Sequence, residues 1–355
     1  MDLGRQCLLR VHYKSLHSLT SVCRSWEATV NSPQFYQDRK ELGASQPLIC
    51  LFELREHLQY VVTVYDPLEG TWETLPALPH FLGCYHRIPL SFNCISVNQK
   101  LVLMGGYNPE EQEDVNTVFI YNFSSGNWSR GADMPVFRTY GTLSVSPEGL
   151  VYVAGGMDNH GNGLRGAAVY NVEEDEWKLL PDMSQERINC ESDFRDGKFF
   201  VIGDDGDDLT TEVYDPERGA WTTIPTEEDS TPPLDGGLAC SVGARSFSFH
   251  MQQQRVMEYD SKEKVWRAVS SFPRTLQVFK SPVGWRDRLF VSGYIAENSR
   301  DEVYYMWTPP PPMCGSESSG SGKWDVIEKP RHYFPVDNDD DPLIMDIDIA
   351  LTVEV

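Results

Sequence analysis

The sequence predicts an all-β protein, a six-bladed β-propeller preceded by a short α-helical segment. Three observations support this fold. A Tyr and a Trp recur seven residues apart, an apolar run ending in glycine precedes most of these copies, and the first 46 residues have helical instead of strand spacing. Repetition at a period of several tens of residues is typical of propellers and solenoids.

The Tyr and Trp copies set the number of blades. Five pairs share the same offset: Tyr65 and Trp72, Tyr121 and Trp128, Tyr170 and Trp177, Tyr214 and Trp221, and Tyr259 and Trp266. A sixth, degenerate copy runs through EVYYMW (302–307), an insertion rich in Pro, Gly and Ser (309–322) that is expected to be a flexible loop, and Trp324. The six Trp residues recur every 44 to 58 positions, which predicts six blades.

Each repeat is predicted to form short strands joined by turns. The apolar runs are four to seven residues long, rich in Val, Ile, Phe, Tyr and Thr, and bounded by Gly, Pro, Asn and Asp. The stretches DPLEGT and DPERGA put Pro early and Gly late, as turns require. A small sheet with two apolar faces must be covered by its neighbours, and radial stacking with Tyr and Trp between sheets achieves this.

The propeller is expected to span residues 47–355 and to be closed by its C-terminal segment. The first blade has three strands where four are expected, beginning with PLICLFEL (47–54). The alternating segment 343–355 is predicted to supply the missing strand and so remove an exposed sheet edge. The alternative is a loose C-terminal tail.

Composition restricts the partners and the location. A formal charge of −23 argues against nucleic acid and against anionic membranes as partners. No apolar run approaches the roughly 18 residues of a membrane span. The eight cysteines show no Cys-x-x-Cys pair, which favours reduced thiols in the cytoplasm or nucleus.

The first 46 residues are predicted to be helical. Apolar residues recur at three- and four-residue steps and predict one helix that ends near Pro33: Leu16, Leu19, Val22, Cys23, Trp26 and Val30. A second short helix is expected to carry Phe35 and Tyr36. A segment this small needs a partner surface to cover its apolar stripe.

Both parts resemble known families. The double glycine, Tyr and Trp of residues 47–355 resemble the kelch repeat, and CLLRV, SL, SVCRSW and SPQFY in residues 1–46 resemble an F-box. Together they resemble the plant kelch-domain-containing F-box proteins. That resemblance implies the substrate-recognition subunit of a Skp-cullin-F-box ubiquitin ligase. Such a subunit binds a Skp-type adaptor, and through it cullin, while its propeller holds a protein client for ubiquitination and proteasomal degradation.

The resemblance also implies which helical residues face the adaptor: Leu8, Leu9, Val11, Leu16, Leu19, Val22, Cys23 and Trp26. Two departures from the family pattern matter. The Leu-Pro stretch ahead of DLGRQCLLR is missing, so the F-box is expected to be shortened, and His12 stands where family members often have Pro. The alternatives are therefore a kelch interaction scaffold without a ligase role, or helices that merely pack on the propeller.

No catalytic residues, metal site or cofactor are predicted. Phosphate loops, nucleophile elbows and zinc-binding helices have no match, and GDDGDD (203–208) is interpreted as a connecting loop. Function is therefore expected on the loops after the Gly-Gly strands and between blades, where a client would bind: Arg87, Tyr107, Asn108, Arg138, Tyr140, Asp158, His160, Arg187, Asn189 and Asp204.

Two of these candidates, Arg138 and Arg187, precede successive repeats at equivalent positions. They are expected either to tie backbone carbonyls or to bind a ligand. The family resemblance suggests clients such as phenylalanine ammonia-lyase, chalcone synthase or cytokinin response regulators, without selecting among them.

Overall fold

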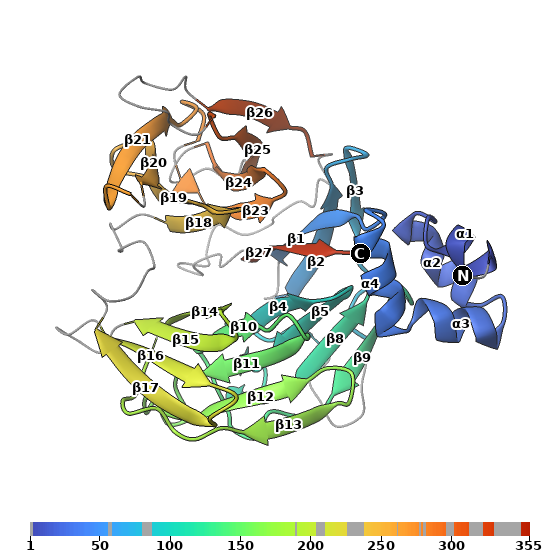
Figure 1. The fold of residues 1–355 in the computed structure, drawn as a ribbon, viewed down its shortest axis with the longest axis horizontal. Coiled ribbons are helices and arrows are strands. Elements are labelled where there is room, and N and C mark those ends of the chain that lie inside the picture. Colours follow the sequence, from blue (N-terminus) through green and yellow to red (C-terminus); the bar gives the residue numbers. More distant parts are fainter. Residues whose placement is uncertain are drawn as a thin grey trace.

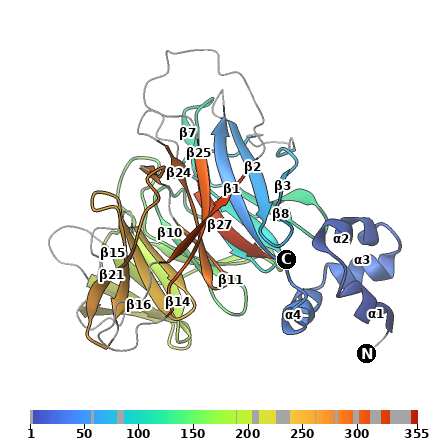
Figure 2. The ribbon, with the colours of Figure 1, turned by 90° about the horizontal axis from the view of Figure 1, so that it is seen from above.

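The structure is a computed structural model that describes most of the chain. The described residues are 3–55, 59–79, 87–188, 190–203, 210–225, 238–260, 262–276, 278–279, 282–295, 302–311, 322–329 and 349–355. Figure 1 shows small sheets arranged around a centre with the helices attached on one side, and Figure 2 shows the same arrangement from above.

Four short helices come first: α1 (Leu3–Leu8), α2 (Tyr13–Thr20), α3 (Arg24–Val30) and α4 (Pro33–Glu41). The α4 helix starts at a recognisable cap, because the Ser32 side chain accepts a hydrogen bond from the Phe35 N–H and Pro33 is the first helical residue. Among the described residues, none of the helices has the length and apolar character needed to cross a membrane.

The prediction of a single helix through the apolar stripe is wrong, since α2 ends at Thr20 and α3 begins at Arg24. Cys23 between them has extended backbone angles. Local side-chain hydrogen bonds explain the break, because Thr20 donates to the His17 carbonyl and Ser21 to the Ser18 carbonyl. Such bonds compete with continuation of a helix.

The strands form six antiparallel blades, which confirms the predicted fold class. Blade 1 contains β27 (Ile349–Glu354), β1 (Pro47–Arg55), β2 (Gln59–Asp66) and β3 (Thr71–Thr74). Blade 2 contains β4 (Asn93–Val97), β5 (Lys100–Met104), β8 (Val118–Asn122) and β9 (Asn127–Gly131). Blade 3 contains β10 (Thr142–Val145), β11 (Leu150–Ala154), β12 (Ala167–Asn171) and β13 (Glu176–Leu179).

The remaining blades follow the same plan. Blade 4 contains β14 (Glu191–Arg195), β15 (Lys198–Gly203), β16 (Thr210–Asp215) and β17 (Ala220–Pro225). Blade 5 contains β18 (Leu238–Val242), β19 (Arg245–His250), β20 (Arg255–Asp260) and β21 (Val265–Ser271). Blade 6 contains β22 (Val278–Phe279), β23 (Val283–Trp285), β24 (Arg288–Tyr294), β25 (Glu302–Thr308) and β26 (Lys323–Ile327). A small ribbon, β6 (Tyr107–Asn108) with β7 (Glu113–Asp114), extends from blade 2.

The repeated Tyr and Trp lie directly opposite each other in the two outer strands of a blade. Tyr65 is paired with Trp72, and Tyr170 with Trp177, where the ring centroids are 4.6 Å apart in both pairs. The seven-residue offset is therefore the register of a hairpin. At its turn the Asp66 carboxylate accepts backbone N–H groups of residues 68 and 69, which explains the Asp or Asn after each Tyr.

In five of the six blades, a Trp indole also donates a hydrogen bond to the preceding blade. Trp128 Nε1 donates to the Pro76 carbonyl at 2.7 Å, in the segment that leaves blade 1. Four further Trp residues make the same kind of bond to the preceding blade: Trp72 to Glu328, Trp177 to Ala132, Trp221 to Pro181 and Trp324 to Ser271. These five junctions between neighbouring blades are thus held by hydrogen bonds as well as by apolar packing.

The double glycines lie where two backbones meet. Gly106 and Gly156 have φ of +104° and +88°, which L side chains rarely adopt. A Cβ atom at Gly156 would clash with the carbonyl of Thr139 in the loop entering blade 3. Glycine therefore lets the second strand of a blade end against the incoming loop.

The C-terminal segment closes the ring as β27. This strand pairs antiparallel with β1 from Pro47 opposite Glu354 to Phe52 opposite Ile349. Residues 343–348 of the predicted closing segment and most of the 309–322 insertion lie outside the described residues. The division of the chain at residue 46 stays a prediction.

Candidate functional site on two faces of the propeller

The propeller has two faces with different connections. The helix face carries the turns between first and second and between third and fourth strands, such as 97–100, 66–71 and 122–127. The loop face carries the loops between second and third strands and those between blades, such as 105–117, 155–166, 132–141 and 180–188. The helices contact the helix face of blades 1 and 2, so the loop face points away from them (Figures 1 and 2).

Apolar residues of the helices share one core with blades 1 and 2. Leu9, Leu16 and Phe35 are fully buried in the same cluster as Leu48 and Phe52 of β1. The helical segment therefore buries part of its apolar stripe against the propeller.

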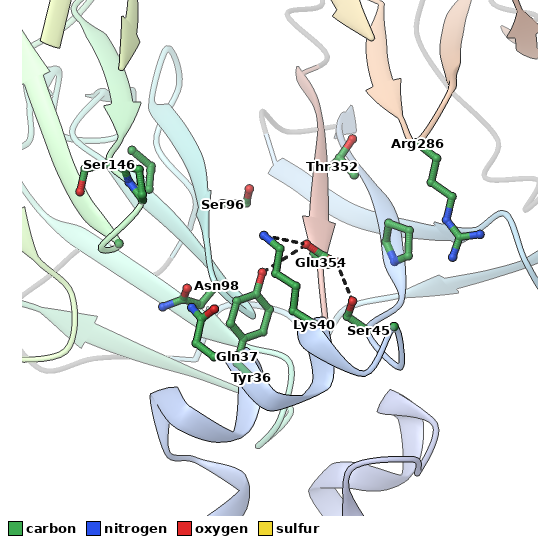
Figure 3. Close-up of a pocket in the computed structure, with 15 residues that line it drawn as sticks. Tyr36, Gln37, Lys40, Ser45, Ser96, Asn98, Ser146, Arg286, Thr352 and Glu354 are labelled. Carbon is green, nitrogen blue, oxygen red and sulfur yellow. Dashed lines mark hydrogen bonds and ion pairs between the residues drawn. The ribbon is translucent and has the colours of Figure 1, made fainter. Parts of the chain in front are cut away.

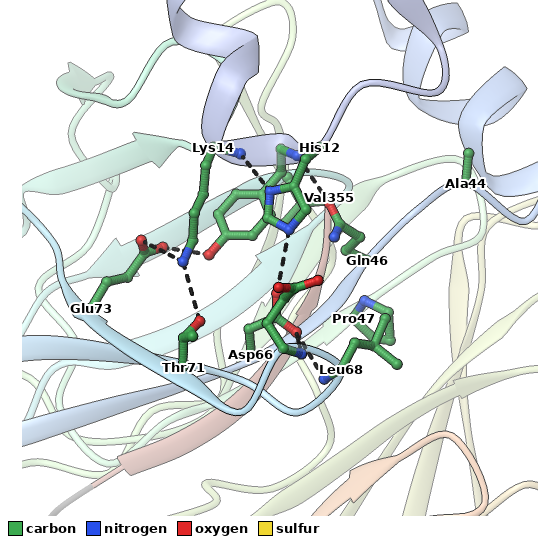
Figure 4. Close-up of polar contacts among 12 residues, drawn as sticks. His12, Lys14, Ala44, Gln46, Pro47, Asp66, Leu68, Thr71, Glu73 and Val355 are labelled. Atoms are coloured by element: carbon green, nitrogen blue, oxygen red, sulfur yellow. Dashed lines mark hydrogen bonds and ion pairs between the residues drawn. The ribbon is translucent and has the colours of Figure 1, made fainter. Parts of the chain in front are cut away.

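Polar contacts reinforce this junction (Figure 4). The Tyr13 hydroxyl donates to Glu73 at 2.5 Å, and its backbone N–H donates to the Gln46 side chain at 2.9 Å. Lys14 donates to Thr71 at 3.2 Å and lies 3.4 Å from the Glu73 carboxylate. Burial, together with the bond to Glu73, raises the pKa of the Tyr13 phenol well above its usual range.

The eight predicted adaptor-facing residues divide into two groups. Leu8, Leu9 and Leu16 are buried in the core that the helices share with the propeller, whereas Val11, Leu19 and Trp26 are half-buried at its edge. Val22 and Cys23 are exposed, Val22 by 60%. Leu3, which was not among the candidates, is 80% exposed.

One buried cation, missed by the sequence reasoning, organises the helices. Arg39 of α4 is fully buried and donates to the carbonyls of Leu9, Val11 and Ala44 at 2.7 to 3.0 Å. Burial lowers the pKa of its guanidinium. A lone Arg in a polar stretch gave no sequence signal for this role.

A polar cavity of about 700 Å³ separates α4 from the turns of blades 2, 3 and 6 on the helix face (Figure 3). Glu354 of β27 is its best-connected group, since it accepts a hydrogen bond from Ser45 at 2.6 Å and pairs with Lys40 at 3.4 Å. Tyr36 also donates to Glu354, at 3.4 Å, and burial together with this carboxylate raises its pKa. The contacts of Glu354 with Tyr36, Lys40 and Ser45 thus connect α4 and the segment after it to the closing strand β27.

On the loop face, the structure separates exposed from buried candidates. Tyr140 is 44% exposed and His160 is exposed, while Arg87, Tyr107 and Asp158 are half-buried. Asn108 is fully buried and its side chain accepts the N–H groups of the next turn. Asn189 and Asp204 lie outside the described residues.

The two equivalent arginines are both buried. Arg187 is 1% exposed, donates to the carbonyls of Gly203 and Thr210 at 2.6 and 2.8 Å, and lies 3.4 Å from Glu212. Arg138 is 3% exposed and donates to the carbonyl of Gly155. Both therefore tie strand-end carbonyls. Glu212, missed by the sequence reasoning, could have been found by aligning TEVYD with the other Tyr copies.

No cluster of three or more His, Cys, Asp or Glu side chains with metal-binding geometry occurs within the described ranges. The acidic stretch 203–208 lies outside them except for Gly203.

These observations define a six-bladed propeller that carries a small helical module on one face. The module matches the F-box domain family over residues 1–38, and blades 2 and 3 match the kelch motif over residues 90–135 and 138–184. The chain thus carries both motifs of the F-box/kelch-repeat proteins, which confirms the resemblance seen in the sequence.

Similar proteins come from Arabidopsis thaliana. The F-box/kelch-repeat protein At1g80440 is 35% identical over 213 residues, which cover 57% of this chain and 59% of that protein. F-box/kelch-repeat protein SKIP20 is 30% identical over 276 residues, covering 63% and 64%. F-box/kelch-repeat protein At1g15670 is 29% identical over 294 residues, covering 76% and 79%. The chain spans less than two thirds of the length of the first two relatives.

Proposed function

We propose that this chain is the substrate-recognition subunit of a Skp-cullin-F-box ubiquitin ligase. In this role the helices bind a Skp-type adaptor, and through it cullin, while the propeller binds a protein client. The chain then acts by raising the local concentration of the client near the ubiquitin-charged enzyme, in the cytoplasm or nucleus.

One observation carries the proposal. Within the segment that matches the F-box, Leu3 and Val22 leave apolar side chains 80% and 60% exposed, with Cys23 exposed beside Val22. Exposed apolar side chains on a small helical module favour a protein partner. Because the helices sit on the helix face, a client on the loop face would not compete with the adaptor for space.

The test is capture of a purified Skp-type adaptor by the full chain. Val22→Asp places a charge on the exposed apolar group and is expected to abolish capture without unfolding the protein. Val326→Asp, at a propeller residue that is 69% exposed, is the matched control and should bind like wild type. Binding by the Val22→Asp variant, or none by wild type, would contradict the proposal.

A second candidate function is a kelch interaction scaffold without a ligase role. The burial of Leu8, Leu9 and Leu16 in the core shared with the propeller favours it, because these residues were expected to face the adaptor. The two candidates differ in adaptor capture, which only the ligase subunit requires.

The client is a further part of the proposal. Phenylalanine ammonia-lyase, chalcone synthase and cytokinin response regulators enter only through the family resemblance. Affinity capture with the proteasome inhibited, using wild type and the Val22→Asp variant, tests them: a true client is retained by both forms but is ubiquitinated only by wild type.

A further inference from the structure

Arg138 and Arg187 hold equivalent positions in front of blades 3 and 4, but only Arg187 has a counter-ion. Its partner Glu212 on β16 is fully buried and lies 3.4 Å away. Arg138 is equally buried, yet within the described part of the chain its guanidinium has no ion pair, and its one hydrogen bond goes to the Gly155 carbonyl. A buried charge without a partner is costly.

The strand register shows which residue of blade 3 stands where blade 4 has the carboxylate partner of its arginine. Tyr170 of β12 and Tyr214 of β16 occupy the same place, opposite Val151 and Phe199 in the second strand of their blades. Two residues before the Tyr, blade 4 has Glu212 and blade 3 has Ala168.

The same comparison extends two residues further back. Thr210, which accepts two hydrogen bonds from Arg187 through its carbonyl and hydroxyl oxygens, is matched by Gly166. Blade 3 therefore keeps the arginine but lacks both side chains that satisfy it in blade 4.

A cavity of about 170 Å³ occupies this place and includes Arg138, Gly166 and Ala168 in its lining. A side chain at Gly166 would start 3.9 Å from Arg138 Nη2, so the guanidinium reaches the empty space. At about 30 Å³ per water, the volume fits about five waters or one amino-acid side chain. Burial lowers the pKa of Arg138 to about 10, which reflects the poor solvation of its charge.

The walls and rim of this cavity are largely apolar. Met134, Val136 and Leu180 contribute to the walls, and Leu179 at the rim is 63% exposed. Asp182 also lines the cavity, but among the described residues it forms no ion pair with Arg138, and its carboxylate would lie 3.9 Å from a Cβ placed at Gly166. The site thus combines one buried cation with largely apolar walls and one carboxylate, Asp182, on the loop face.

We propose that the Arg138 cavity is a client-binding subsite that takes a glutamate side chain of the client, whose carboxylate replaces the missing partner. The methylenes of a glutamate suit the apolar walls, and a glutamate of the chain itself fills the equivalent place in blade 4. Val136 and Leu179, which line the cavity and are also exposed to solvent, fit an apolar residue beside that glutamate. The inference rests on the proposed client-binding function.

The test uses two small probes, N-acetyl-glutamate methylamide and the uncharged N-acetyl-glutamine methylamide, titrated into the full chain and followed by NMR of methyl groups. The glutamate probe is expected to shift the methyl signals of Met134, Val136 and Ala168 saturably. The glutamine probe should bind at least about tenfold more weakly, because it forms no charge-assisted bond. Equal binding of both probes, or no shift with either, would overturn the proposal.

Variants distinguish a glutamate subsite from an internal pair between Arg138 and Asp182. Ala168→Glu supplies the carboxylate from β12, as in blade 4, and should remain folded, melt at a higher temperature and lose the probe. Val326→Glu adds the same charge at a distant exposed position and should bind the probe like wild type. If only Asp182→Asn binds the probe, Asp182 is the partner of Arg138 and the proposal is wrong. Adaptor capture by Ala168→Glu should be unchanged, so failure of the subsite is distinguishable from failure of the ligase role.

Discussion

Tyr13 of helix α2 and Glu73 of strand β3 are joined by a 2.5 Å hydrogen bond across the junction between the helices and the propeller. The Tyr13 ring also meets Phe123 edge-on, with centroids 6.4 Å apart. This pair couples the helical module to the outer strand of blade 1.

Tyr13→Phe should therefore weaken the junction. It keeps the ring contact and removes the bond to a half-exposed carboxylate, at an expected cost of about 1 kcal/mol in the free energy of unfolding. Urea unfolding measures this cost. Tyr140→Phe removes an exposed hydroxyl on the loop face and should change nothing. An equal effect of both substitutions would argue against the junction.

Trp128→Phe tests the bonds between blades. The substitution removes the 2.7 Å bond to the Pro76 carbonyl and part of a buried ring, so we expect a loss of about 2 kcal/mol. Trp26→Phe is the control, because the Trp26 indole is half-buried and has no hydrogen bond among the described residues. Thermal unfolding of both variants checks the difference, and a larger loss for Trp26→Phe would contradict it.

Glu212→Ala should be among the most damaging single substitutions in the propeller. It leaves Arg187 buried without its partner, and breaking a buried pair in this way costs about 3 to 5 kcal/mol. The double variant Arg187→Met with Glu212→Leu removes both charges and should recover much of the loss. Chemical denaturation of the three proteins measures this, and a double variant no more stable than the single one would show that the unpaired charge is not the cause.

Thiol labelling should distinguish exposed from buried cysteines. Cys7 and Cys23 are exposed, whereas burial raises the pKa of Cys190 to about 11 and that of Cys50 well above its usual value. At neutral pH, less thiolate forms at the buried sites, so iodoacetamide should modify Cys7 and Cys23 before Cys50 and Cys190, as read by mass spectrometry. If the ligase proposal is right, the bound adaptor slows labelling of Cys23.

Alkaline pH should destabilise the fold through its tyrosines. Burial raises the pKa of Tyr121 from 10.0 to about 12, and the pKa of Tyr170 is also raised. Above pH 10 the unfolded chain loses these protons while the folded protein keeps them, so stability is full below pH 10 and falls as pH rises toward 12. Urea midpoints on both sides of pH 10 test the sign, and a midpoint that rises with pH would contradict it.

The blade count was predictable because the repeated signal is a register. Tyr and Trp face each other across a hairpin, so their offset is fixed wherever the hairpin is kept. Even the degenerate sixth copy follows the rule, since Trp307 lies opposite Trp324 in the place of the Tyr. The offset there is lost only because an insertion lengthens the turn.

The adaptor-facing residues were less predictable, because the spacing of apolar residues does not say which side of a helix is covered by the propeller. Leu16 and Val22 belong to one apolar stripe, yet one is fully buried against the propeller and the other is 60% exposed. The break between α2 and α3 turns the two residues to different surroundings. The sequence likewise could not distinguish the two loop-face arginines: Arg138 and Arg187 look alike in sequence, and their difference lies in Ala168 and Glu212 on other strands.

The pairing of β27 with β1 has a kinetic consequence. It brings Leu48 next to Val353, so the contact closes a loop of nearly the whole chain and is expected to form late, when the intervening blades are compact. Refolding should therefore end with a slow phase in which β27 pairs with β1 and completes the four-stranded sheet of blade 1. Glu354 also contacts Ser45 and Lys40, so we expect the helices to reach their final position on the propeller in that same last step.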